Sequence, residues 1–273
     1  METPDSPKPA RALFRWIPIL AIVLVVGTSL LFMKCAVSDG AIEANIKELR
    51  AAADNLRRNP RDKQSLSVLV NQLSHRNRVY RSNAAAVLGE AAPDVGAAIA
   101  AEAVPALAKL LDQGDNYNQR AAASALGRFG GHALAALPAL RKRLTPSDRD
   151  VAWFSADAIR NIGGPAAEAV PELTRALQEQ VNRCHGYFSP CTRSFIPALG
   201  AIGPGATAAK PDLEALLDHE DLYLRMAAAV ALLQIDASHQ RAHTKVDELL
   251  ETSDEELKER TLRTLKESKL QKN

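Results

Sequence analysis

Residues 157–177 read DAIRNIGGPAAEAVPELTRAL, and this stretch decides the fold. Ile159 and a second isoleucine three residues later lie on one face of a helix, which Gly163 then ends. After Pro171, two leucines four residues apart give a second helix an apolar face of its own. The stretch therefore predicts two short helices joined by a tight turn.

The same pattern recurs along the chain at nearly constant spacing. Its first apolar position is filled in turn by Leu126, Ile159, Leu199 and Leu232, at intervals of 33, 40 and 33 residues. Three residues later come Phe129, Ile162, Ile202 and Ile235. The next positions are Gly130, Gly163, Gly203 and Asp236, where we expect a left-handed residue to end the helix. Helix-ending residues that recur at a fixed spacing indicate a repeat architecture rather than an ordinary alanine-rich bundle.

The second helix of each unit has its own recurring core. The expected buried positions are Leu140, Leu173, Leu213 and Val246, followed four residues later by Leu144, Leu177, Leu217 and Leu250. Pro138, Pro171 and Pro211 recur near the start of these helices. An earlier unit matches with five extra residues, and its Leu88-Gly89 corresponds to Leu126-Gly127. In the same unit, Pro105, Leu107 and Leu111 match the second helix.

This combination of features resembles HEAT repeats. The second helix carries Val-Pro-x-Leu and the first closes on Ala-Leu-Gly-x-Ile-Gly, a pattern most similar to the short bacterial type first noted in phycobilin lyases. The resemblance covers about residues 65–252. It implies an all-α, armadillo-like α-solenoid of stacked helical hairpins, but by itself it implies no reaction.

The composition agrees with an all-α fold and limits the classes of partner. Hydrophobic residues make up 47% of the chain and aromatic residues only 4%, so its apolar content is mostly alanine and leucine. With 34 basic and 32 acidic residues, the net charge is +2. A chain so close to neutral has no global field that attracts polyanions, so we expect no nucleic acid among its partners.

The N-terminal region contains an uncharged stretch from Trp16 to Met33. Its 18 residues would span about 27 Å as a helix, which is close to the thickness of the bilayer hydrocarbon. We predict a single transmembrane anchor. A cleaved signal peptide, with Ala36-Val37-Ser38 as cleavage site, stays open as the alternative, although 18 residues exceed the usual apolar core.

The cations around this stretch predict its orientation. Three precede it and two follow it, namely Lys8, Arg11 and Arg15 against Lys34 and Lys47. This balance favours a cytoplasmic N-terminus and an exported, periplasmic or extracellular repeat domain. The predicted organisation is a cytoplasmic tail (1–15), the transmembrane helix (16–33), a juxtamembrane linker with a degenerate first helix (34–64), the repeats (65–252) and a C-terminal capping helix (253–273).

No residue pattern predicts an active site, a metal centre or a cofactor. The histidines are scattered over different units. HEAT-like deoxyhypusine hydroxylases bind iron through several His-Glu pairs, whereas this chain has one, His219-Glu220. His239 and His243 share a helix face without the intervening glutamate of a zinc protease, and we expect them to be solvated.

The interval of 40 residues marks an insertion of seven residues near positions 182–190. Cys184 and Cys191 flank most of it. In an exported protein we predict that they form a disulfide. A metal site that also uses His185, or two free thiols in a cytoplasmic protein, are the alternatives.

A charged column on the second helices is the candidate interaction surface. Four residues after the proline position, the units carry in turn Lys109, Lys142, Arg175, Ala215 and Glu248. Neighbouring charges are Arg141, Arg143, Glu214 and Asp247. The layer thus changes from basic to acidic, and the resemblance implies that it lines the concave side of the solenoid. We predict that these charged residues bind a protein partner, with a merely solvated face as the alternative.

Together these features predict a membrane-tethered, non-enzymatic scaffold or adaptor that binds proteins. A lyase-like enzyme or enzyme subunit is the alternative, and the fold resemblance alone carries it. No small-molecule substrate is evident from the sequence.

Overall fold

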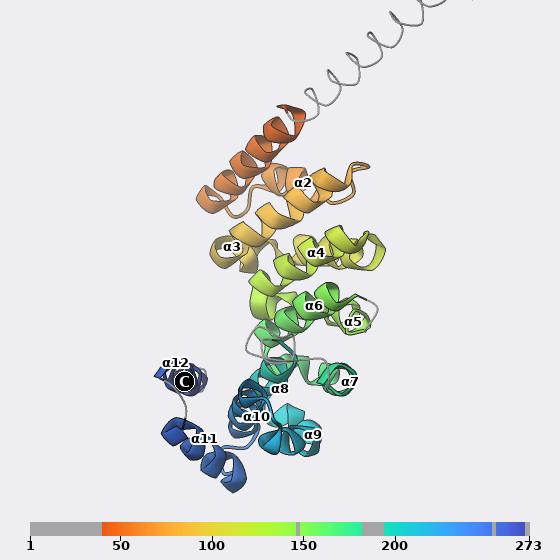
Figure 1. Ribbon diagram of the computed structural model, residues 1–273. Helices are drawn as coiled ribbons and strands as arrows, with labels where there is room; N and C mark the ends of the chain where they lie inside the picture. Colours follow the sequence, from red (N-terminus) through yellow and green to blue (C-terminus); the bar gives the residue numbers. More distant parts are fainter. Residues whose placement is uncertain (1–39, 146–147, 182–193, 253–254, 271–273) are drawn as a thin grey trace, which may run out of the picture. The chain divides into compact units, whose positions relative to one another are not determined.

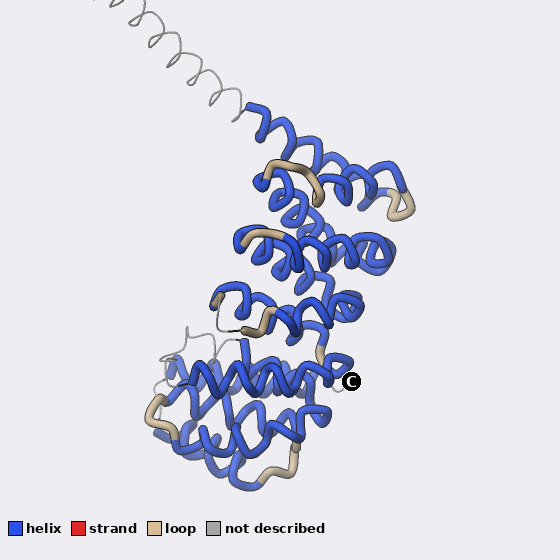
Figure 2. Tube along the Cα trace, turned by 90° about the vertical axis from the view of Figure 1, so that its right-hand side faces the viewer, coloured by secondary structure: helices blue, strands red, loops and turns tan. Residues whose placement is uncertain are grey.

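The computed structural model describes residues 40–145, 148–181, 194–252 and 255–270, and every regular element in these ranges is a helix (Figures 1 and 2). The chain divides into two units, Met1–Glu48 and Leu49–Asn273. Residues 40–48 are helical in the first unit, and 49–58 are helical in the second. The α-helices that follow are α2 Lys63–Gln72, α3 Arg78–Gln113, α4 Asn116–Phe129, α5 Leu137–Lys142, α6 Arg149–Ile162, α7 Val170–Gln180, α8 Ile196–Ile202, α9 Lys210–Ala215, α10 Leu222–Ile235, α11 Gln240–Thr252 and α12 Glu255–Leu270.

The second unit is built from repeated helical hairpins in two layers. The first helices α4, α6, α8 and α10 follow one another down Figure 1, and each packs on the next. The second helices α5, α7 and α9 lie beside them. Short 3₁₀ segments join the two helices of a hairpin, namely η2 Gly130–Ala136, η3 Gly164–Ala169 and η6 Gly203–Ala209. The prediction of an all-α solenoid of HEAT-like repeats is confirmed.

The core lies between the layers and is made of the predicted apolar positions. Leu126, Ile159, Leu199 and Leu232 are fully buried, as are Leu140, Leu173 and Leu213 on the second helices. In α11 we expected Leu250 to be buried, but it is only partly buried, and the neighbouring Leu249 is buried instead. Buried positions recur with the repeat because each hairpin covers the apolar face of the one before it.

The turn that ends each first helix requires glycine in three of the four units. Gly130, Gly163 and Gly203 have φ of 54°, 74° and 69° with ψ near −140°, a region that only glycine occupies readily. The expectation for Asp236 is wrong, since its backbone is extended, with φ −143°. Its carboxylate accepts hydrogen bonds from the backbone N–H and the hydroxyl of Ser238, so a side-chain turn replaces the glycine conformation.

A second set of glycines lets successive first helices approach closely, a role that we did not predict. A Cβ added at Gly127 would lie 3.4 Å from the Cα of Ala158, and one at Gly200 would lie 3.1 Å from the Cα of Ala231. The glycine of each Leu-Gly pair thus faces an alanine of the next first helix. Small residues at such crossings allow short distances between helix axes.

The unit around α3 differs from the expected hairpin. We matched this unit to the paired helices of the later repeats, but α3 is hydrogen-bonded as one helix from Arg78 to Gln113. No glycine of α3 has a positive φ. Gly89 instead lies against α4, where a Cβ added to it would be 3.0 Å from the Cα of Ala125. Pro93 and Pro105 lie inside this helix, where each removes one backbone donor.

Candidate partner-binding face

An exposed ridge that runs from the C-terminal part of α3 to the second helices α5 and α7 repeats a proline and a cation four residues apart. Positions four apart lie on one helix face, and all the residues of this set are exposed. We call the set the proline–cation ladder, which comprises Pro105, Lys109, Pro138, Lys142, Pro171 and Arg175. In the next unit Pro211 is followed by Ala215, which is also exposed. The ladder therefore extends over three units and then loses its charge.

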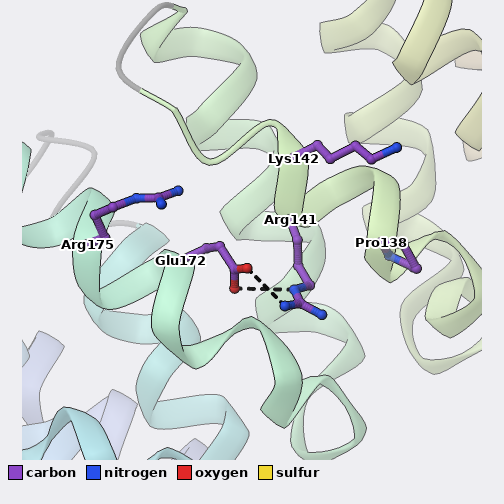
Figure 3. Close-up of a pocket in the computed structure, with 5 residues that line it drawn as sticks. All are labelled: Pro138, Arg141, Lys142, Glu172 and Arg175. Atoms are coloured by element: carbon purple, nitrogen blue, oxygen red, sulfur yellow. Dashed lines mark hydrogen bonds and ion pairs between the residues drawn. The ribbon is translucent and has the colours of Figure 1, made fainter.

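An open recess of about 280 Å³ lies between α5 and α7 in the middle of this ladder (Figure 3). It is lined by Pro138, Arg141, Lys142, Glu172 and Arg175. The first helices pack directly on one another, whereas α5 makes its contacts with the next unit mainly through α6 and η3. The spacing of the second helices leaves room for a surface depression, which is too open to enclose a small molecule as typical ligand pockets do.

Arg141 and Glu172 occupy the floor of the recess as an ion pair between two repeats. The Nε and Nη2 of Arg141 donate to the two carboxylate oxygens of Glu172 at 3.2 and 2.9 Å, and Nη1 lies 3.2 Å from Glu168 (Figure 3). Burial alone would raise the pKa of the Glu172 carboxyl, but the hydrogen bond and charge of Arg141 hold it below its usual value. This pair makes the floor nearly neutral and ties α7 to α5.

Lys142 of α5 and Arg175 of α7 line the recess beside this pair (Figure 3). Their side chains are 66% and 56% exposed. The Nζ of Lys142 lies 3.8 Å from Asp112, and the Nε of Arg175 lies 4.0 Å from Glu179. Exposed pairs at such distances contribute little energy, so a ligand can replace them at small cost. Lys109 is exposed as well.

Arg143 stands apart from the ladder, although we included it in the predicted interaction surface. Its Nη2 donates to the backbone carbonyl of Asp112 at 3.0 Å and lies 3.4 Å from the carboxylate of that residue. The guanidinium thus fixes the end of α5 to the end of α3. Of the predicted cations, Arg141 and Arg143 serve contacts between repeats, while Lys109, Lys142 and Arg175 face solvent.

The acidic residues at the other end of the predicted column do not form one cluster. Glu214 contacts the Nε2 of His239 at 2.8 Å, and Glu248 accepts from Lys245 at 2.7 Å, while Asp247 is exposed. The expectation of a solvated His239 is wrong, since its side chain is only 10% exposed. Its Nδ1 accepts from the N–H of Ala242 in the first turn of α11, so this histidine has a structural role.

His219, of the His-Glu pair, belongs to a turn that a second histidine in the described part of the chain also forms. The Nδ1 of His219 accepts from the N–H of Asp221, and Arg225 donates to the His219 carbonyl at 2.8 Å. His75 makes the same contacts with the N–H of Asn77 and with Arg81. Within the described ranges, no three histidine, cysteine or acidic side chains gather as metal ligands.

Three predicted features lie outside the described residues. These are the anchor Trp16–Met33, the pair Cys184 and Cys191, and the start of the capping helix at Ser253. In the part of the chain that the structure describes, no helix combines the length and apolarity needed to span a membrane.

Replacing Glu172 tests the energetic role of the pair on the recess floor. Folding lowers the pKa of the Glu172 carboxyl from an ordinary value near 4.5. The ionised carboxylate therefore stabilises the folded protein at a pH above that ordinary pKa, and this stabilisation is lost as the pH falls through the lower pKa of the folded state. We expect Glu172→Gln to lower the urea midpoint at pH 7 and to reduce the further loss of stability as the pH falls below about 5. Glu168→Gln is the matched control, because Glu168 is 78% exposed. Equal acid sensitivity of Glu172→Gln and the unmodified chain would show that the pair contributes nothing.

A family model described as HEAT repeats matches residues 66–152 and 104–183. The resemblance to HEAT repeats, expected from the recurring motifs, is thereby confirmed for this part of the chain. No curated protein matches the chain.

Solved structures match over most of the chain. An engineered protein is 26% identical with a TM-score of 0.54, covering 75% of this chain and 96% of its own. The complex of CpcE and CpcF of phycocyanin lyase from Nostoc sp. PCC7120 is 25% identical with a TM-score of 0.56, covering 73% of this chain and 75% of its own. A designed armadillo repeat protein in complex with the peptide (KR)4 is 19% identical with a TM-score of 0.56, covering 70% of this chain and 91% of its own. The last of these indicates the fold alone.

Proposed function

We propose that this chain is a non-enzymatic scaffold or adaptor that binds a protein partner through the exposed face of its second helices. The observation that carries the proposal is the proline–cation ladder, where Lys109, Lys142 and Arg175 extend from successive repeats without serving the core. Charged side chains that are not needed for packing are available for recognition. The open recess between α5 and α7 adds a concave surface to this face.

A similar protein supports a role in binding. The CpcE and CpcF structure, which is 25% identical to this chain, is a complex of two proteins. A stacked array gives a partner a long, continuous surface, because each repeat adds a similar strip to the one before it. Extended surfaces of this kind suit protein partners better than small molecules.

Two tryptophan substitutions test which layer binds. Pro171 is exposed on α7 in the second-helix layer, and Ser124 is exposed on α4 in the first-helix layer. We expect Pro171→Trp to abolish co-purification of partner proteins with the full chain, because a large side chain prevents close approach. Ser124→Trp should retain the same partners at the same yield. The proposal would be refuted if only Ser124→Trp abolished co-purification of the partners, or if the unmodified chain bound no protein.

We extend the proposal to a membrane tether at Trp16–Met33, on the basis of its 18 uncharged residues. We expect the full chain to resist extraction by alkaline carbonate and to dissolve in detergent, because a spanning helix is held by the hydrocarbon. Deletion of residues 1–35 should release a helical domain into the soluble fraction. Recovery of the undeleted chain in the soluble fraction would contradict the tether and the export of the repeats inferred with it.

We also propose a disulfide between Cys184 and Cys191, which follows from export to an oxidising compartment. Closing so short a loop should stabilise the protein by about 2–3 kcal/mol, because it restricts the unfolded chain. Alkylation before and after reduction, followed by peptide mass analysis, measures the state of both thiols. Labelling of both without reductant, in protein from its native compartment, would exclude the disulfide and weaken the inferred export.

A lyase-like activity is the second candidate function, and the phycocyanin lyase complex at 25% identity is the observation that favours it. An assay with a bilin and its acceptor protein separates the two proposals. A scaffold leaves the acceptor unmodified, whereas a lyase, or a subunit completed by its partner, produces a covalent bilin adduct visible by absorbance on a denaturing gel.

A further inference from the structure

We propose that the proline–cation ladder binds an acidic segment of the partner in an extended, polyproline-like conformation, with one carboxylate facing each repeat. This inference rests on the proposed function, because it names the class of partner that the second-helix face recognises. The ligand chemistry is a series of three carboxylates spaced three residues apart.

The charges on the ladder are positioned to recognise such a segment. Lys109, Lys142 and Arg175 occupy the same place in three successive units, at intervals of 33 residues. Arg141 is already engaged by Glu172 and Glu168, so the cations that remain for a ligand are separated along the stack instead of gathered at one point. A row of separated cations fits a row of separated carboxylates.

The spacing of the repeats selects the conformation of the ligand. The first helices of successive units pack directly on one another, and packed helices lie about 8–10 Å apart, so the stack advances by about this distance from one ladder position to the next. A polyproline II helix has three residues per turn and rises about 3.1 Å per residue, so every third side chain returns to the same face after about 9 Å. In a β-strand, alternate residues face opposite sides, and every third residue would therefore point away.

The surroundings of the cations support a peptide as the occupant. The rings of Pro138 and Pro171 are exposed beside Lys142 and Arg175, and they offer apolar contact to the residues between the carboxylates. The recess itself is lined by no aromatic side chain on which a base could stack, and Glu172 lies on its floor. These features disfavour a nucleic acid strand.

The length of the segment is limited by the change of sign along the stack. At the fourth unit the ladder position is Ala215, and the neighbouring side chains include Asp212 and Glu214. A longer acidic ligand would meet these carboxylates and be repelled. Three carboxylates with two residues between each pair therefore define a binding segment of about seven residues.

Fluorescence anisotropy of the full chain in nonionic detergent tests this inference with three labelled nonapeptides. In the first, glutamates at positions 1, 4 and 7 are separated by proline and alanine. The second has the same composition with the glutamates adjacent, and the third replaces each glutamate of the first by lysine. We expect the spaced acidic peptide to bind at least about 5-fold more tightly than the adjacent one, and more weakly as salt increases. The lysine peptide should not bind.

Charge reversal identifies the residues involved. Lys142→Glu combined with Arg175→Glu should weaken binding of the spaced peptide at least about tenfold, because attraction becomes repulsion. Arg58→Glu combined with Lys63→Glu makes the same change in net charge at exposed positions outside the ladder, and should stay within about twofold of the unmodified chain.

Several results would overturn the inference. These are equal binding of the spaced and adjacent peptides, no acidic peptide binding, or an unchanged affinity of the ladder variant. Binding of phosphatidylserine vesicles or duplex DNA that the ladder variant loses, with no binding of the acidic peptide, would assign the cations to another polyanion. If the acidic peptide fails to bind while Pro171→Trp still removes the partner, the inference is wrong and the proposed function stands.

Discussion

Leu173→Ala is expected to lower the free energy of unfolding by about 2–5 kcal/mol, the largest effect that we predict for one side chain. Leu173 is fully buried on α7, between the hairpins that the solenoid stacks. Truncation leaves a cavity that the rigid contacts of neighbouring repeats cannot close. Urea unfolding of the full chain, followed by circular dichroism, measures the loss.

Arg175→Ala is the matched control for this variant. Arg175 lies two residues further along the same helix, and its side chain is exposed. We expect its removal to change the free energy of unfolding by no more than about 0.5 kcal/mol. Similar unfolding midpoints for the two variants would mean that the buried and exposed faces of α7 are wrongly assigned.

Gly130→Ala is expected to destabilise the protein by about 1–3 kcal/mol, because alanine at this φ and ψ is strained. Gly130 has φ 54° and ψ −133° at the end of α4, where the chain turns into η2. Gly131→Ala is the control, since Gly131 lacks a positive φ and an added Cβ there meets no atom within 4 Å. That change should be neutral or stabilise the protein by up to about 1 kcal/mol. Equal effects would show that the turn does not require glycine.

The repeat and its core could be predicted from the sequence because they depend on local periodicity. Ile159 and Leu173 belong to patterns that recur, and each recurrence supports the assignment of the others. The close approach of Gly127 to Ala158 could not be predicted, because it depends on which face of α4 meets the next helix. The continuous α3 was missed because Leu88-Gly89 matches Leu126-Gly127, whereas the turn in the later units depends on a further glycine, Gly130 in α4's unit. The corresponding residue of α3 is Ala92.

The candidate site could be predicted only as a set of cations. The column of Lys109, Lys142 and Arg175 follows from helical spacing, and the structure places all three at the surface. The sequence could not separate them from Arg141, whose partner Glu172 is 31 residues away. The partly buried position of His239 was missed for the same reason, since Glu214 contacts it from an earlier helix. Ion pairs between side chains of different repeats depend on how successive repeats are stacked. A local sequence pattern does not contain this information.

Functional use of the second-helix layer is the central claim, and amide hydrogen exchange tests it most directly. The exchange of the full chain is compared with and without its co-purified partner, peptide by peptide. We predict slower exchange in the presence of the partner at Leu137–Lys142 and Val170–Gln180, the helices that border the recess. The rate of exchange in the peptides that cover the first helices Asn116–Phe129 and Arg149–Ile162 should not change. Protection confined to the first helices, with none on α5 or α7, would contradict the account.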